Sequence, residues 1–109
     1  MQEIQSFQEI EEFINSNDIV LLYFSTQECS VCKVLKPKVE EMVKEYPEIV
    51  LRYIDLEKIE LAKGKFSVFT IPTILMFING KEFIREARYI SVEDLQNKIL
   101  RYYELYKIE

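Results

Sequence analysis

The sequence predicts one α/β domain, in which a mixed β-sheet carries helices on both faces and the element order is β-α-β-α-β-α-β-β-α. Strand-like apolar runs alternate with segments of helical periodicity along most of the chain. Near the end, Asn79-Gly80 joins two strand-like segments and is a strong type I′ hairpin signal. A length of 109 residues, 49% of them hydrophobic, with two Gly and three Pro, suits a compact domain spanning residues 1–109.

The first half of the chain carries a short strand, a helix, a buried strand and a long helix. Ile4 is expected to begin the short strand, and Ser6-Phe7-Gln8-Glu9 is a capping box that opens a helix running to about Asn15. Residues 19–24 form a continuous apolar run within a strand expected to reach Ser25, which is typical of a central strand covered on both faces. In the long helix that follows, we expect Pro37 to cause a kink.

The second half of the chain contains the hairpin and the last two helices. The remaining strands are expected at 50–55, 73–78 and 81–89. A short helix is expected at 59–63, where Gly64 should weaken or end it. Ser91 caps the final helix. Its apolar stripe consists of Leu95, Ile99, Tyr102, Tyr103 and Tyr106.

Composition excludes several classes of function. A net charge of −5 argues against a nucleic-acid partner, because duplex binding needs clustered positive charge. No uncharged stretch approaches the roughly 18 residues of a membrane helix, and the cysteine content is low, so we expect no membrane association and a cytoplasmic protein with reduced thiols. The chain has no histidine, which rules out a histidine base or a Cys-His pair.

The two cysteines of the chain form the motif Cys29-Ser30-Val31-Cys32, where the buried strand gives way to the long helix. The thiolate is the species that attacks disulfides, and the free N–H groups and dipole of a helix N-terminus favour it. We therefore expect Cys29 to be the exposed nucleophile and Cys32 to resolve the mixed disulfide. Lys33 and Lys36 should favour ionisation of Cys29, whereas the charge of Glu28 should oppose it.

A metal site is the alternative interpretation of the cysteine pair. Zinc needs about four ligands, and the chain has no further Cys or His to complete a site. A metal or cluster shared between two chains remains open as an alternative.

The chain resembles the thioredoxin family over nearly its whole length. Besides the cysteine pair, Pro37 follows Cys32 by five residues, as the family's kinking proline follows its second cysteine. The residues that resemble the run into the family's cis-proline and the hairpin beyond it are Glu60-Leu61-Ala62, Lys65-Phe66, Val68, Ile71-Pro72-Thr73, Phe77 and Asn79-Gly80. A glutaredoxin fits less well, since that family usually lacks the extra N-terminal strand and helix.

The resemblance implies a thioredoxin fold and a thiol–disulfide oxidoreductase that acts on protein disulfides. It implies that Ile71–Pro72 is cis, that Pro72 packs against the cysteines, and that Ile71 binds substrate backbone as an added strand would. It further implies a monomer that uses the Cys29–Cys32 disulfide in place of a cofactor and takes electrons from a donor similar to thioredoxin reductase.

Four departures from the family pattern lie at the expected site. Glu28 replaces a tryptophan and Arg88 a groove-lining glycine, and both are candidate substrate-binding residues. Ser30-Val31 replaces Gly-Pro, which suggests a less reducing potential than that of thioredoxin. Tyr23 replaces a buried aspartate; we expect a core aromatic whose phenol is a poor proton acceptor at neutral pH. These departures leave open a non-catalytic binding module or a redox sensor as the alternative function.

Overall fold

The computed structural model describes residues 1–108 as five strands and four helices. The strands are β1 (Gln2–Glu3), β2 (Ile19–Ser25), β3 (Ile49–Asp55), β4 (Thr73–Ile78) and β5 (Lys81–Ala87). The helices are α1 (Phe7–Ser16), α2 (Ser30–Val43), α3 (Leu61–Phe66) and α4 (Val92–Ile108). The observed order is the one that the sequence predicts.

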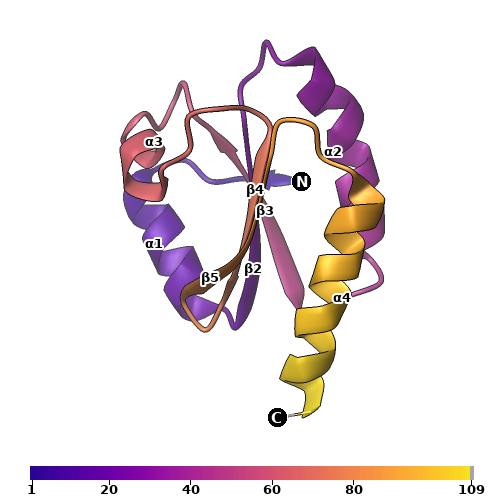
Figure 1. Ribbon diagram of the computed structural model, residues 1–109. Coiled ribbons are helices and arrows are strands. Elements are labelled where there is room, and N and C mark those ends of the chain that lie inside the picture. Colours follow the sequence, from indigo (N-terminus) through magenta and orange to yellow (C-terminus); the bar gives the residue numbers. More distant parts are fainter. Residues whose placement is uncertain (109) are drawn as a thin grey trace.

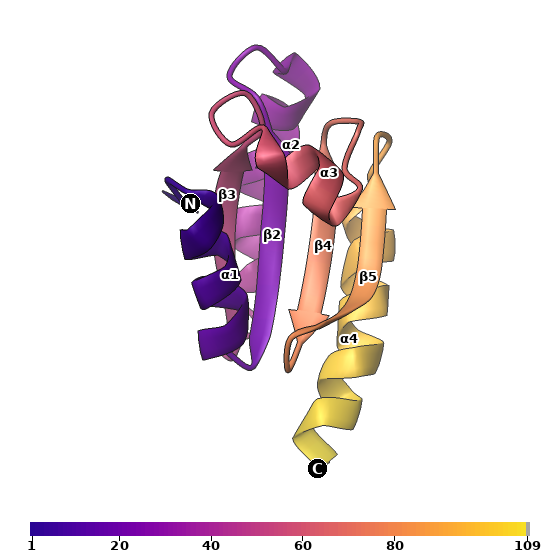
Figure 2. The ribbon, with the colours of Figure 1, turned by 90° about the vertical axis from the view of Figure 1, so that its left-hand side faces the viewer.

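The five strands form one mixed sheet in the order β1-β3-β2-β4-β5. Strands β1 and β2 run parallel to β3, whereas β4 is antiparallel to both β2 and β5. Figure 2 shows β3, β2, β4 and β5 side by side, with α1 and α3 in front of them. Strand β2 is therefore central, and all seven of its residues are buried.

The helices cover the two faces of the sheet in pairs, α1 with α3 and α2 with α4 (Figure 1). Because successive side chains of a strand point to opposite faces, β2 contributes to two separate cores. Leu21 and Tyr23 pack on the side of α2 and α4, whereas Leu22 and Phe24 pack on the side of α1 and α3. A central strand that is apolar on both faces is thus explained by helices on both sides.

Three connections meet at one end of the sheet. They lead from β2 to α2, from α3 to β4 and from β5 to α4, and both views show them at the upper edge (Figures 1 and 2). This follows from topology, since β2 and β5 end at the same edge at which the antiparallel β4 begins. Cys29, Pro72 and Arg88 lie on these connections, and the rest of the cysteine motif forms the first turn of α2.

Helix α3 differs from its predicted position. It begins at Leu61, continues through Gly64 and ends at Phe66, so that Gly64 does not end it. The end is made by Ser67, which adopts a left-handed conformation with φ of 52°, and the N–H of Val68 closes the turn on the Lys63 carbonyl. The final strand is also shorter than predicted, because it stops at Ala87.

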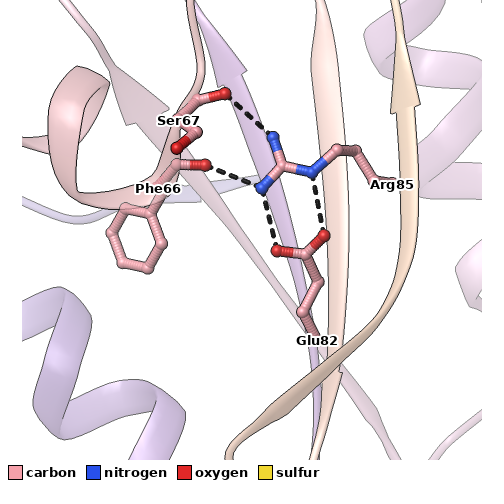
Figure 3. Close-up of polar contacts among 4 residues, drawn as sticks. All are labelled: Phe66, Ser67, Glu82 and Arg85. Atoms are coloured by element: carbon pink, nitrogen blue, oxygen red, sulfur yellow. Dashed lines mark hydrogen bonds and ion pairs between the residues drawn. The ribbon is translucent and has the colours of Figure 1, made fainter.

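Arg85 of β5 fastens the end of α3 to the sheet (Figure 3). Its guanidinium donates to the carbonyls of Phe66 at 2.7 Å and Ser67 at 3.0 Å, which the end of a helix leaves without helical partners. A bidentate pair with Glu82, with both contacts at 2.8 Å, orients the same group. Arg85 therefore fixes the start of the segment that leads to Pro72.

Within residues 1–108, no helix has both the length and the apolar character needed to cross a membrane. Helix α4 is amphipathic: Leu95 and Ile99 are fully buried against the sheet, and Tyr102, Tyr103 and Tyr106 lie partly buried at the edge of the same core. The stripe expected from the sequence is thus the packed face of this helix.

Candidate active site

The two cysteines lie at the N-terminus of α2 and form a disulfide, with their Cα atoms 5.2 Å apart. Cys29 is the N-cap residue and is partly exposed, whereas Cys32 in the first turn is 2% exposed. The two sulfurs therefore differ in access: a substrate can reach Cys29, and Cys32 lies beneath it. This difference in access is what the roles expected from the sequence require of the two sulfurs.

The backbone of α2 favours a negative charge on Cys29. The N–H of Cys32 donates to the Cys29 sulfur at 3.2 Å, as a capping side chain would accept it. In the reduced protein the same N–H and the helix dipole would stabilise a thiolate at this position. The structure thus supplies the source of thiolate stabilisation that the motif's position predicted.

The peptide bond between Ile71 and Pro72 is cis, as the resemblance implied. Pro72 is buried and Ile71 is partly exposed beside the cysteine motif. The hydroxyl of Thr73 donates to the Thr70 carbonyl at 2.7 Å, which holds the turn before the proline. At the other side, the N–H of Arg88 donates to the Pro72 carbonyl at 2.8 Å. The proline loop is thereby fixed to the residue that follows β5.

A groove of about 630 Å³ brings the predicted site residues together. Cys29, Glu28, Ile71, Pro72 and Arg88 all line it. Tyr89, which is 96% exposed, lines it as well. The sequence does not single out Tyr89, which falls at the end of the strand expected at 81–89; its position one residue after Arg88 is the available signal. Opposite charges and an exposed ring thus surround the accessible sulfur.

Arg88 has φ of 66°, in the left-handed region that favours glycine. The family has glycine at the position that Arg88 matches, so this conformation fits the family's backbone while the side chain departs from it. The arginine is exposed, and it presents a cation to the groove at the cost of backbone strain.

A second, smaller cleft of about 170 Å³ lies on the Cys32 side of the motif and is lined by Tyr23 and Tyr53. The Tyr23 hydroxyl donates to the Cys32 carbonyl at 2.7 Å, within the buried core. Burial, and secondarily the neighbouring Tyr53, raises the pKa of Tyr23 above its ordinary value. Burial also raises the pKa of Tyr53, and a hydrogen bond with Ser25 offsets only part of this rise.

Lys33 and Lys36 line this second cleft, on the side of Cys32. The ammonium of Lys36 lies over the ring of Tyr53, 5.0 Å from the ring centroid. Lys33 and Lys36 are three residues apart, so both lie on the same face of α2, and that face borders the cleft with Tyr53 of β3. The two lysines thus border the cleft that contains Cys32, and their effect on the Cys29 thiolate stays a prediction.

A disulfide at a helix N-terminus, with one sulfur exposed, one buried and a cis-proline beside them, defines the class of thioredoxin-fold thiol–disulfide oxidoreductases. Among residues 1–108, no three side chains of Cys, Asp or Glu gather as a candidate metal site. The disulfide itself is the chemically competent group in this part of the chain.

Comparison with known proteins gives the same class. Residues 2–101 match the thioredoxin family. The thioredoxin-like protein YdfQ of Bacillus subtilis is 38% identical over 109 residues, which cover 100% of this chain and 97% of that protein. The thioredoxin of Buchnera aphidicola is 30% identical over 84% of both chains. The X-ray structure of Fasciola hepatica thioredoxin aligns with a TM-score of 0.84 and 31% identity, over 93% of this chain and 98% of that one.

The chain belongs to the thioredoxin family. Its Cys29–Cys32 pair makes it a thiol–disulfide oxidoreductase, and the family acts on protein disulfides. The predicted fold and class of activity are thereby confirmed.

Proposed function

We propose that Cys29 attacks disulfides of partner proteins and that Cys32 resolves the mixed disulfide so formed. The observation that carries this assignment is the difference in exposure of the two sulfurs, together with the N–H of Cys32 that donates to the Cys29 sulfur. The exposure of Cys29 lets a substrate reach its sulfur, and the hydrogen bond from the Cys32 N–H stabilises the attacking thiolate.

The exchange proceeds in two balanced steps. The Cys29 thiolate bonds to one sulfur of the substrate disulfide, whose S–S bond breaks, and the second substrate sulfur leaves as a thiolate that takes up a proton. The Cys32 thiol then loses its proton, and its thiolate attacks the Cys29 sulfur. The Cys29–Cys32 bond forms as the bond to the substrate breaks, and the substrate leaves as a dithiol. Two electrons pass from the cysteine pair to the substrate.

The groove lined by Glu28, Ile71, Pro72 and Arg88 is the proposed binding site for the substrate chain. Ile71 would pair with extended substrate backbone; its partial exposure in the groove beside Cys29 supports this role. Arg88 would attract acidic side chains next to the target cysteine. We propose no cofactor beyond the cysteine pair, a monomer, a cytoplasmic location and a reductase similar to thioredoxin reductase as the electron donor.

Alkylation of the reduced protein tests the division of labour. With limiting iodoacetamide near pH 7, Cys29 should be modified first and with an apparent pKa below the ~8.5 of a free thiol, because the helix N-terminus stabilises its thiolate. Peptide mapping of partly alkylated samples measures the order. Faster modification of Cys32 would exchange the two roles.

Arg88 should affect both the Cys29 thiolate and the stability of the fold. The Arg88→Gly variant should raise the Cys29 pKa, because a cation that lines the same groove is lost. It should also raise the free energy of unfolding by about 1 kcal/mol, because glycine adopts positive φ without strain. Thiolate absorbance against pH and urea unfolding measure the two effects.

Two further variants separate charge from backbone strain at this position. Arg88→Ser removes the cation but keeps a Cβ atom, so the strain of the left-handed backbone remains. It should therefore raise the Cys29 pKa without the gain in the free energy of unfolding that is expected for Arg88→Gly. Arg88→Lys keeps the charge and should leave the pKa close to that of the parent. A thiolate titration that is the same in all four proteins would place Arg88 outside the electrostatics of the site.

A further inference from the structure

Tyr23 connects the central strand to the first turn of the active-site helix. Its ring is fully buried, and its hydroxyl donates to the backbone carbonyl of Cys32 at 2.7 Å. Strand β2 is held on both sides by β3 and β4, so the phenol is fixed by a rigid part of the fold. The resolving cysteine is thereby anchored through its own peptide group.

The first turns of α2 lack one of their helical hydrogen bonds. Pro37 has no N–H, so the Lys33 carbonyl one turn earlier lacks its helical hydrogen bond, and helices commonly bend at such positions. Tyr23 holds the turn before that point. Tyr53 lies beside Tyr23 in the sheet register, with ring centroids 6.1 Å apart, and its ring lies under the ammonium of Lys36. Two neighbouring strands thus hold the first turns of α2.

We propose that Tyr23 is a positioning residue for the second step of disulfide exchange: by donating to the Cys32 carbonyl, its buried hydroxyl holds the Cys32 sulfur in line with Cys29. This inference rests on the roles proposed above for the two cysteines. Its physical basis is that thiolate attack on a disulfide depends on the alignment of the sulfurs, and small displacements of a reacting atom slow a reaction strongly. The first step, in which Cys29 attacks the substrate, does not need the anchor.

Tyr23 does not act as the base that removes the Cys32 proton. Its own proton is engaged with the Cys32 carbonyl, and burial keeps the phenol protonated at neutral pH. The thiol proton instead passes to water in the cleft on the Cys32 side. Besides Cys32, the residues lining this cleft that carry charged or titratable groups are Met1, with its N-terminal ammonium, Glu3 on β1, Tyr23 on β2, Lys33 and Lys36 on α2, and Tyr53 on β3. The pH dependence of the second step therefore follows the ionisation of Cys32 among these groups.

The test is the Tyr23→Phe variant, which removes one oxygen atom and keeps the ring. The reduced protein is mixed in a stopped-flow instrument with an aromatic disulfide whose thiol product absorbs visible light. The first equivalent of product reports the mixed disulfide, and the second reports its resolution by Cys32. Tyr53→Phe is the matched control, because it removes a phenol from the same cleft whose hydroxyl pairs with Ser25 instead of Cys32.

Tyr23→Phe should release the first equivalent at the parent rate and the second about fivefold more slowly, the effect of one lost neutral hydrogen bond. A fivefold loss in the formation of the Cys29–Cys32 disulfide should also make the reduction potential of the cysteine pair about 20 mV less negative. The pH midpoint of the second step should not move. In Tyr53→Phe both steps and the potential should match the parent.

Other outcomes identify which inference fails. Equal second-step rates in Tyr23→Phe and the parent would overturn the positioning role, as would equal slowing of both steps. A loss of a hundredfold or more with a displaced pH midpoint would make Tyr23 the proton acceptor. If the parent releases a single equivalent, or if Cys32→Ser releases two, the proposed cysteine roles fail, irrespective of Tyr23.

Discussion

Replacing Cys32 with serine should convert the protein into a trap for its substrates. Cys29 would still attack, because its thiolate is stabilised by the N–H of residue 32, which serine retains. The mixed disulfide would then persist, because the buried thiol that releases it is gone. Cys32→Ser should accumulate covalent complexes with substrate proteins, and a reducing agent should cleave them. Non-reducing electrophoresis measures these complexes.

Cys29→Ser should form no such complexes, because the remaining sulfur is 2% exposed. Either substitution should lower the turnover of a model protein disulfide, with dithiothreitol as donor, by at least about three orders of magnitude, as loss of a nucleophile does. Complexes that form equally in both variants would show that the two sulfurs are interchangeable. A parent protein whose turnover does not exceed that of dithiothreitol alone would assign the chain to partner binding, in which the cysteines take no part.

Most of the fold could be predicted because its signals are local. The apolar run within 19–25 and the Asn79-Gly80 turn gave strand boundaries that agree with the structure. Helix α3 was misplaced because the end of a short helix depends on tertiary contacts. The guanidinium of Arg85, 18 residues beyond Ser67, binds the last carbonyls of that helix, and no local pattern encodes this contact.

The candidate site could be predicted for residues whose place in it depends only on their position along the backbone. The spacing of Cys29 and Cys32 at a strand-to-helix junction places them correctly, and the match of Arg88 to a groove-lining glycine of the family places it in the groove. Side-chain direction was not predictable. The ammonium of Lys36 lies over Tyr53, a contact that the helical pattern alone does not specify. Tyr23 was assigned to the core, which is correct, but its hydrogen bond to Cys32 depends on the three-dimensional distance between a strand and a helix.

Tyr23→Asp should destabilise the fold strongly. The substitution removes a fully buried ring that stacks on Tyr53 and places a carboxyl group in an apolar core. We expect a loss of about 3 to 5 kcal/mol, a large part of the stability of a domain this size. With no tryptophan in the chain, urea unfolding is best followed by far-UV circular dichroism.

The stability loss should increase with pH. Burial raises the pKa of the new carboxyl in the folded protein above the ~3.9 of the unfolded chain, so the folded state binds the proton more tightly. Below pH 4 both states are protonated and only the packing loss remains. Above that, the variant loses further stability until the folded-state pKa is passed. Tyr23→Asn, which has the same shape and no charge, should show the packing loss without the pH dependence.

In the folded fraction, Tyr23→Asp should resolve the mixed disulfide faster than the parent. It loses the hydroxyl that positions Cys32, a cost of about fivefold, but it gains a general base beside the Cys32 thiol, which is typically worth 10²-fold or more. The gain exceeds the cost, so the second thiol product should appear sooner near pH 8, whereas Tyr23→Asn should show only the slowing. A folded Tyr23→Asp protein that resolves no faster than the parent would mean that water in the cleft of the parent already accepts the proton as efficiently as a carboxylate.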